Sequence, residues 1–337
     1  QKCATNSDLS SVSCNSHKFF MFIDANDFVY LLMFNDLSKL NRPNGCPISK
    51  ESSMTKTDLG TETDMALNLV DLARFPISDL DSGEGAAFLK ECQDHMDAHG
   101  WCNLDGFIRP DALTALEDEA SNLLPGAEVL TIKRNIYQGA IDPSLPKDDP
   151  RRREYTHVAT QLADDQLPSD TLVQQLYKSE ILTEFVRRVQ KKPVLYRCAD
   201  EFQALNVVAL YPGSWHAWHY DTTECTVTLL LKAAESGGHF AFLPNSRKDD
   251  TEDREAVDRV LAGDMSHAQK FDRGAGTFTL FRGGYSLHGV TEVFGESPRI
   301  TAIMTYDEQE TRVISDDINV RIYGKRVKKI LSDRKAA

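Results

Sequence analysis

Cysteine is scarce in this sequence and never occurs as a closely spaced pair. The 337 residues include seven cysteines, an odd number scattered from Cys3 to Cys225, and no C-x-x-C motif is present. A disulfide framework needs an even set of cysteines, and a zinc knuckle needs closely spaced ligands. The pattern argues against both and is typical of the reducing cytoplasm, where we expect the protein to be located.

An excess of positive charge is also lacking. The formal net charge is −13 at pH 7, with 38 lysines and arginines against 51 aspartates and glutamates. A protein that binds the nucleic-acid backbone presents a basic face, so we expect no nucleic-acid partner. One basic cluster stands near the C-terminus, and we expect it to belong to a solvated tail over residues 311–337: Lys325, Arg326, Lys328, Lys329, Arg334 and Lys335.

No apolar run is long enough to cross a membrane. The most apolar stretch, residues 19–34, is interrupted by Asp24, Asn26 and Asp27, whereas a membrane helix needs about 20 apolar residues. The stretch also lacks the charged, apolar and small-residue order of a signal peptide. We therefore expect no membrane association, and we expect residues 1–65 to be a poorly ordered extension that the fold does not need.

The part of the chain that follows, residues 66–192, has the pattern of supporting helices. Apolar residues recur at helical spacing, with Pro110 at the first turn of one segment and Gly100 after the end of another. The polar, proline-containing stretch 142–165 predicts a long loop. The predicted elements here are helices over 85–99, from 110 to 123 and over 172–189, and a strand over 101–108.

From residue 193 to residue 310 the pattern is that of β-structure. Short runs rich in Val, Leu, Thr and Phe are separated by Gly and Pro, and one helix over 252–261 interrupts them. We predict an α+β protein with a double-stranded β-helix core of the jelly-roll or cupin type and N-terminal flanking helices, in a single domain over residues 66–330. The predicted strands cover 193–198, 204–211, 216–221, 225–232, 239–243, 277–282, 286–294 and 299–306.

Two His-x-Asp triplets occur, and their predicted elements distinguish them. His95 and Asp97 lie within a predicted helix, where residues i and i+2 point roughly 200° apart and cannot hold one ion. His219 and Asp221 follow an extended run, where residues i and i+2 share one face. The second triplet therefore predicts a metal site.

A later histidine completes this site. His288 stands at the start of a predicted strand after two glycines. Two histidines and one carboxylate leave coordination positions open, as in non-haem Fe(II) oxygenases, whereas zinc more often recruits Cys or a third His. We predict that His219, Asp221 and His288 bind Fe(II) and form the catalytic centre; the alternative is two histidines satisfied within the core beside a surface aspartate.

Arg299 follows His288 by eleven residues and alternates with apolar residues along a predicted strand. An arginine on the inner face of a barrel is costly unless it meets an anion. Its planar fork matches a carboxylate in two parallel hydrogen bonds. The distal carboxylate of 2-oxoglutarate is such an anion, and a protein carboxylate is the alternative partner.

Together these motifs resemble the Fe(II)/2-oxoglutarate dioxygenase superfamily. The resemblance covers roughly residues 95–325 and is strongest over 198–307. Three segments are similar to sequences of the branch whose members hydroxylate or chlorinate free amino acids: residues 198–247, GTFTLFRGGYSLHGVTEVFGESPRITAIMTYDE and RIYGK. Chlorinating members have Gly at the carboxylate position, so Asp221 implies oxidation without halogenation.

The resemblance implies further site residues, and ordinary packing is the alternative for each. Two of them are expected to bind 2-oxoglutarate, Asn206 and Thr228. Four others are expected to contact the substrate: His216, Thr222, Ile303 and Thr305.

The activity implied is hydroxylation of an unactivated C–H bond with Fe(II), 2-oxoglutarate and O2, releasing succinate and CO2. The expected substrate is a small molecule, a free amino acid or an amino-acid-derived metabolite of secondary metabolism. Three alternatives remain: desaturation or oxidative cyclisation of the same substrates, hydroxylation of a peptide or protein, and a non-catalytic cupin-like metal-binding protein. An inward Arg299 argues against the last of these.

Overall fold

A computed structural model describes residues 66–139, 141–149, 152–248 and 251–336, and the backbone of three short strands before them. The chain divides into two compact units, Gln1–Thr55 and Lys56–Ala337. The first unit contains an antiparallel sheet of β1 (Ser10–Cys14), β2 (His17–Ile23) and β3 (Val29–Phe34). The expectation of a poorly ordered extension over residues 1–65 otherwise concerns residues outside the described part of the chain.

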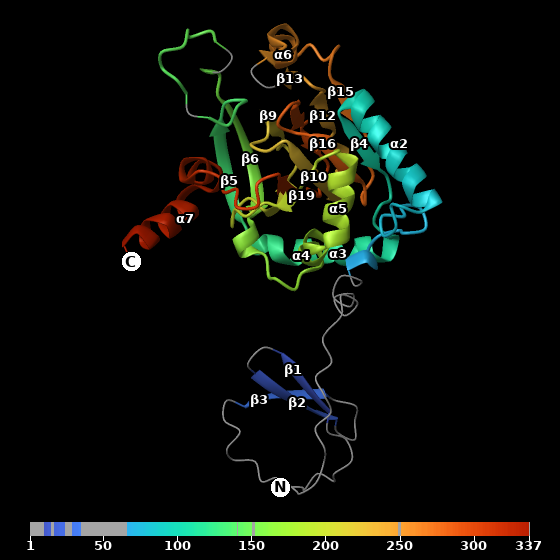
Figure 1. Ribbon diagram of the computed structural model, residues 1–337. Coiled ribbons are helices and arrows are strands. Elements are labelled where there is room, and N and C mark those ends of the chain that lie inside the picture. The colour runs from blue at the N-terminus through green and yellow to red at the C-terminus, as the bar shows by residue number, and fades with distance from the viewer. Residues whose placement is uncertain are drawn as a thin grey trace, which may run out of the picture. The chain divides into compact units, whose positions relative to one another are not determined.

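The second unit is built on two facing antiparallel sheets (Figure 1). The larger sheet has the order β4 (Trp101–Leu104), β16 (Phe278–Arg282), β10 (Cys225–Lys232), β19 (Arg299–Asp307), β8 (Leu205–Leu210), β6 (Tyr155–Leu162), β5 (Glu128–Arg134), with β7 (Tyr196–Arg197) pairing β19. The smaller sheet has the order β15 (Gln269–Phe271), β12 (Phe240–Leu243), β17 (Leu287–Val290), β9 (His216–His219). Two short pairs complete the strands, β11 (Ser236–Gly237) with β18 (Val293–Phe294) and β13 (Arg247–Lys248) with β14 (Thr251–Glu252). This is the predicted double-stranded β-helix.

The central strands have two buried faces with different chemistry. Along β10, Val227 and Leu229 belong to the main apolar cluster, whereas Thr226 and Thr228 line a cavity between the sheets. Because side chains alternate along a strand, one face packs on helices and the other presents polar groups to the interior. β19 follows the same rule, with Ile300, Ala302 and Met304 in the apolar cluster and Arg299, Thr301 and Ile303 at the cavity.

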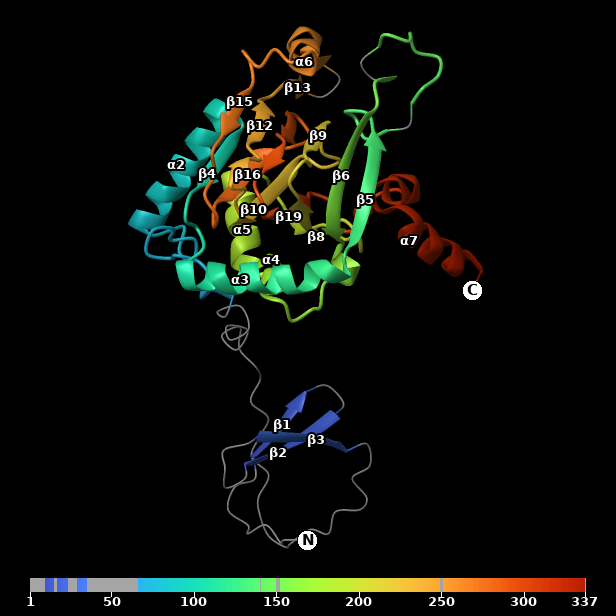
Figure 2. The same ribbon diagram turned by 180° about the vertical axis from the view of Figure 1, so that it is seen from behind.

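Helices cover the outer face of the larger sheet, as Figure 2 shows from behind. They are α2 (Gly83–His99), α3 (Pro110–Leu123), α4 (Leu172–Lys178) and α5 (Glu180–Val189); α6 (Arg254–Leu261) lies away from them. The single helix predicted over 172–189 is in fact two, because Ser179 ends α4 and its hydroxyl caps α5 by accepting from the backbone N–H of Leu182. None of the helices in the described part of the chain combines the length and apolarity of a bilayer span.

The loop predicted over 142–165 was wrong in its last third. Residues 155–162 form β6, which pairs with β5 along its whole length and with β8 on its other side. The prolines and charges that suggested a loop lie before residue 155. The segment after them (YTHVATQL) has a β-branched residue at every second position: Thr156, Val158 and Thr160. β5 was not predicted at all, although its side chains alternate between exposed and buried towards its end.

The predicted tail over 311–337 contains a helix, α7 (Asp316–Ala336), which lies beside β5 in both views (Figures 1 and 2). Five of the six basic residues are exposed, as predicted for a solvated cluster, and Arg326 is partly buried. Gly324 interrupts α7 with φ 66° and ψ −139°. Tyr323 and Val327 are buried, and Arg326 pairs with Asp165 at 2.5 Å. Many residues of this segment are charged, but apolar residues among them are buried and hold the helix against the rest of the unit.

Candidate metal centre

Two neighbouring strands of the smaller sheet bring the predicted metal ligands together. His219 ends β9, and His288 lies opposite it on β17 as its direct antiparallel partner. Asp221 follows two residues after His219, and its backbone N–H donates to the carbonyl of Gly283 at 3.0 Å. The sheet therefore sets the two rings side by side, and the Gly283 contact turns the carboxylate toward them.

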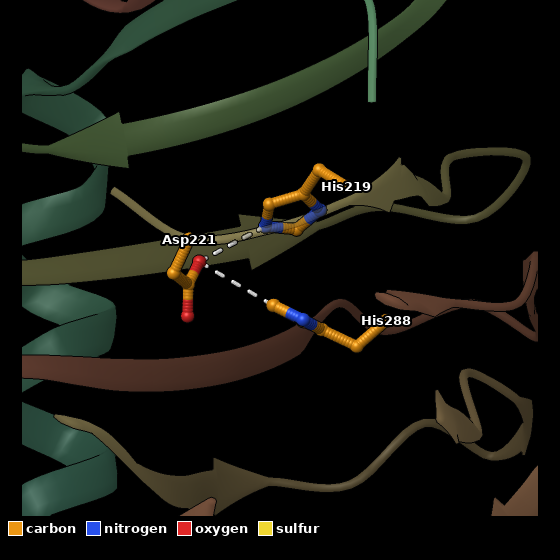
Figure 3. Close-up of side chains that lie close together, drawn as sticks. All are labelled: His219, Asp221 and His288. Carbon is orange, nitrogen blue, oxygen red and sulfur yellow. Dashed lines mark ion pairs between the residues drawn. The ribbon is translucent and has the colours of Figure 1, made fainter. Parts of the chain in front are cut away.

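The three side chains point at one another (Figure 3). The Oδ1 atom of Asp221 lies 3.3 Å from Nε2 of His219 and 3.4 Å from Nε2 of His288. One ligand atom from each residue lies within 4.8 Å of the other two, and no other such group occurs among the described residues. The spacing is that of groups around one ion.

Backbone carbonyls set the orientation of both rings. Nδ1 of His219 lies 2.8 Å from the carbonyl oxygen of Ala217, and Nδ1 of His288 lies 2.9 Å from that of Ser286. A carbonyl only accepts hydrogen bonds, so each Nδ1 carries the proton and each Nε2 keeps its lone pair. Burial, with the nearby charge of Arg134, lowers the pKa of His219 to about 3, so this ring is neutral at physiological pH.

One carboxylate oxygen of Asp221 has no partner within the described residues, and a bound cation would be such a partner. This atom, Oδ2, is buried and accepts no hydrogen bond within the described residues. A Cβ atom on Gly283 would lie 2.0 Å from Oδ2, so only glycine leaves room for this carboxylate. Two neutral imidazoles and one carboxylate with an unpaired oxygen are a donor set that fits Fe(II).

The other His-x-Asp triplet, in α2, forms no shared site, because its two side chains contact different partners. Nδ1 of His95 lies 2.8 Å from the carbonyl oxygen of Trp101. Asp97 instead pairs with Lys191 and with Arg282. The two side chains have separate partners, as expected for residues i and i+2 of a helix.

Arg299 faces the interior beside the triad. Together with His219, Asp221, His288 and Thr228 it lines a cavity of about 500 Å³, which we call the Arg299 cavity. Its guanidinium donates to the hydroxyl of Thr301, and within the described residues it forms no ion pair with a carboxylate. Burial lowers the pKa of Arg299 to about 10, so the side chain still carries its charge at neutral pH. It is a buried cation that faces an open space.

A second cavity of about 590 Å³ adjoins the first, and we call it the Arg134 cavity. His219 and Asp221 line both cavities. Of the residues predicted to contact substrate or 2-oxoglutarate, five line the Arg134 cavity: Asn206, His216, Thr222, Ile303 and Thr305. Asn206 is thus separated from Arg299, and its side-chain oxygen accepts from Gln161 at 2.7 Å and from Tyr323 at 2.9 Å.

Comparison with known proteins decides the family. Residues 85–323, which make up most of the chain, match the family model described as Halogenase D. The chain belongs to this family. The resemblance to the Fe(II)/2-oxoglutarate oxygenases is thereby confirmed, and the protein is an enzyme of that type. No curated protein matches the chain.

Solved structures of low sequence identity resemble this halogenase D family member. The non-haem alpha-ketoglutarate-dependent epimerase SnoN from nogalamycin biosynthesis is 18% identical, with 66% of this chain and 82% of that chain covered and a TM-score of 0.49. HygX from Streptomyces hygroscopicus, solved with nickel, 2-oxoglutarate and hygromycin B, is 14% identical, with coverages of 65% and 87% and a TM-score of 0.45. A 2OG-Fe(II) oxygenase family oxidoreductase from Burkholderia pseudomallei is 13% identical, with coverages of 66% and 92% and a TM-score of 0.44.

Two buried arginines of this halogenase D family member were not predicted as site residues from the sequence. Arg134 ends β5 and lines the Arg134 cavity, and Arg273 follows β15 and lines the Arg299 cavity. For Arg134 a weak signal was present, because Ile132 and Arg134 share one face of a segment with β-type alternation. For Arg273 we find none, since it lies outside any strand and its neighbours in sequence are polar, aromatic or glycine.

Proposed function

We propose that this protein hydroxylates a free amino acid or a close amino-acid derivative, using Fe(II), 2-oxoglutarate and O2, and that it does not halogenate. In this proposal His219, Asp221 and His288 hold the iron. Arg299 and Thr228 bind 2-oxoglutarate, and Arg134 with the residues around it binds the substrate.

One observation carries the proposal: the two cavities share a wall that includes His219 and Asp221, and different buried arginines line them. His219 and Asp221 line both cavities, whereas Arg299 lines only the first of them and Arg134 only the second. Both guanidinium groups are buried, at 3% and 5% exposure. Burial lowers the pKa of Arg134 to about 10, and the charge of Asp221 opposes this shift, but neither arginine forms an ion pair with a carboxylate within the described residues. A buried cation without such a pair is costly, so each arginine indicates an anionic ligand. Two anions at two sides of one metal centre fit a dicarboxylate co-substrate and a carboxylate-bearing substrate.

On the co-substrate side, the protein supplies a charged fork and a hydroxyl. Arg299 provides paired N–H donors for the distal carboxylate, and the Thr228 hydroxyl lies in the same cavity wall. Iron, when bound together with 2-oxoglutarate and O2, supplies the oxidising power to remove hydrogen from an unactivated C–H bond, with succinate and CO2 as co-products.

On the substrate side, Arg134 is already positioned by neighbours that leave part of its fork available. One terminal nitrogen donates to Oε1 of Gln138 at 2.8 Å and the other to Nε2 of His216 at 2.7 Å, while its Nε has no partner. Burial keeps the pKa of His216 well below its usual value, so this neutral ring can accept from Arg134. We infer that the substrate carboxylate binds here, which holds the target carbon near the iron.

The rest of the Arg134 cavity supports a zwitterion with a partly apolar side chain. Thr222 and Thr305 provide hydroxyl groups, and Gln203 provides an amide oxygen that suits an ammonium group. Ile303 provides an apolar contact.

The absence of halogenation follows from Asp221. Its carboxylate fills the place that chlorinating relatives leave open with glycine, and Gly283 lies directly against it. A halide would have to displace an anion that the iron itself stabilises. We therefore expect oxygen rather than chlorine in the product.

The test is turnover of the full chain with a library of free amino acids. The protein is reconstituted without oxygen with Fe(II) and 2-oxoglutarate, then mixed with aerated buffer containing chloride, and succinate and product masses are measured. We expect one amino acid, or a few related ones, to stimulate succinate release and to gain one oxygen atom.

Other outcomes separate the alternatives. A product that has lost two hydrogens identifies desaturation or cyclisation, and stimulation only by peptides identifies a peptide hydroxylase. A chlorinated product would contradict the role given to Asp221. If none of the candidate substrates stimulates succinate release, the proposal that the protein hydroxylates an amino acid is wrong.

A further inference from the structure

Arg273 is a second buried arginine in the Arg299 cavity. It follows β15 and precedes Gly274, and only 9% of it is exposed. The cavity that contains the triad, Arg299 and Thr228 also includes Arg273 in its wall. None of the roles assigned above uses this side chain.

The neighbours of Arg273 hold its guanidinium in place without neutralising it. Nη1 donates to the hydroxyl oxygens of Thr228 at 2.9 Å and Thr279 at 2.8 Å. The Cζ atom lies 4.6 Å from the ring centroid of Phe240, a cation–π contact. Nε is buried and has no partner within the described residues. The group is oriented on one side and leaves hydrogen-bonding capacity on the other.

Two like charges are therefore buried in the wall of one cavity. Neither guanidinium donates to a carboxylate within the described residues; Arg299 donates to Thr301, and Arg273 to the two threonines. Burial and the charge of Arg299 together hold the pKa of Arg273 well below its usual range, and the charge of Asp105, which forms no ion pair with Arg273, opposes them only in part. Burying two cations close together is unfavourable unless an anion lies near both.

Resting on the proposed function, we propose that Arg273 is a second binding group for the distal carboxylate of 2-oxoglutarate, so that two guanidinium groups hold this end of the co-substrate. The carboxylate has two oxygens and about four acceptor positions, which is enough for donors from both arginines. The site is then a selective one for a 2-oxo diacid.

The two threonines beside Arg273 differ in a way that fits this geometry. Thr279 accepts from Arg273 and donates its own hydroxyl hydrogen to Oδ1 of Asn103 at 2.6 Å. Thr228 also accepts from Arg273 but has no acceptor for its hydrogen within the described residues, and it lines the cavity. Arg273 therefore turns the Thr228 hydroxyl into a donor for the same carboxylate.

The decisive comparison is between 2-oxoglutarate and 2-oxopentanoate, which has the same carbon chain without the distal carboxylate. Binding of each acid to the Mn(II)-loaded full chain is measured by calorimetry without oxygen, so that no turnover is needed. Arg273→Met removes the charge and keeps an apolar stem, and Arg273→Lys keeps a charge if the first variant folds poorly. The control is Arg74→Met, which removes an arginine that stacks on Phe75 and lines neither the Arg299 cavity nor the Arg134 cavity.

We expect Arg273→Met to weaken 2-oxoglutarate binding by about tenfold to a hundredfold and to leave 2-oxopentanoate binding nearly unchanged. Arg273→Lys should restore part of the difference, and Arg74→Met should change neither acid. An equal loss for both acids would show that Arg273 only supports the cavity wall. Unchanged binding of 2-oxoglutarate would also overturn the proposal.

One other result has to be separated from these. Arg273 and Arg299 also line a groove of about 830 Å³ together with Gly238 and Asp272. If inorganic phosphate or succinate binds the wild type without competing with 2-oxoglutarate, the second arginine serves that groove and the proposal is wrong. Wild-type protein that binds 2-oxoglutarate but never releases succinate would contradict the proposed function and leave the two-arginine site standing.

Discussion

The Arg299 cavity and the Arg134 cavity share one wall but differ in the elements that complete them. Arg299, Thr226 and Thr228 come from β19 and β10, the central strands of the larger sheet. Arg134 comes from β5 at the edge of that sheet, and Tyr323 comes from α7. Strands β8, β9, β10 and β19 thus contribute to both cavities, and only the Arg134 cavity adds residues of β5 and α7. Peripheral elements can change without disturbing the barrel.

The largest effect is expected where the two cavities meet, because a change there affects both. Asp221→Ala removes the carboxylate ligand and should abolish iron binding and succinate release together, while the fold remains. Iron content and succinate are measured on the same sample. Asp97→Ala is the control from the other triplet; it breaks half-exposed ion pairs and should change the free energy of unfolding by less than about 1 kcal/mol without affecting iron. Iron retained by Asp221→Ala would exclude the metal assignment.

A smaller effect, limited to one side, is expected from Arg134→Met. The change removes a charged donor from the Arg134 cavity alone, so the KM for the amino-acid substrate should rise by about tenfold to a hundredfold. The KM for 2-oxoglutarate should stay the same. Lys133→Met is the matched control, because this neighbour is 62% exposed and pairs with Glu154. If Arg134→Met raises both KM values alike, the two cavities are not separate sites.

The smallest effect is expected from Arg299→Lys, which keeps the charge and loses the fork. A point charge replaces two parallel hydrogen bonds, so the KM for 2-oxoglutarate should rise by about tenfold while the KM for the substrate stays unchanged. Steady-state rates at varied concentrations of each compound give both values. A rise only in the substrate KM would reverse the assignment of the two cavities.

Prediction from the sequence succeeded where the pattern was local. Strands such as β8 and β10 are short runs of β-branched and apolar residues between turn signals, and their predicted bounds differ from the observed ones by a residue or less. β5 was missed because it is the edge strand of the larger sheet and its side chains alternate between exposed and buried only towards its end. β6, which pairs with both β5 and β8, was missed because polar and proline residues precede it directly in sequence. α7 failed because charge dominates its composition, and its few buried residues become apolar anchors only against β5.

The residues of the candidate site also fall into a group that the sequence predicted and a group that only the structure shows. His219, Asp221, His288 and Arg299 were found because spacing on a strand determines which face a side chain occupies. Arg134 and Arg273 were missed because their burial depends on packing between elements. Arg273 lies on no strand, and its position follows from contacts with Thr228, Thr279 and Phe240.

By itself, the sequence determined most of the central strands and the choice between the two His-x-Asp triplets, since each depends on residue type and local periodicity. Only the tertiary structure decided that His219 and Asp221 stand between two cavities and that buried arginines line both. The reason is physical: whether an arginine is solvated or buried without a counter-charge depends on every element packed around it, and no short window of sequence contains that information.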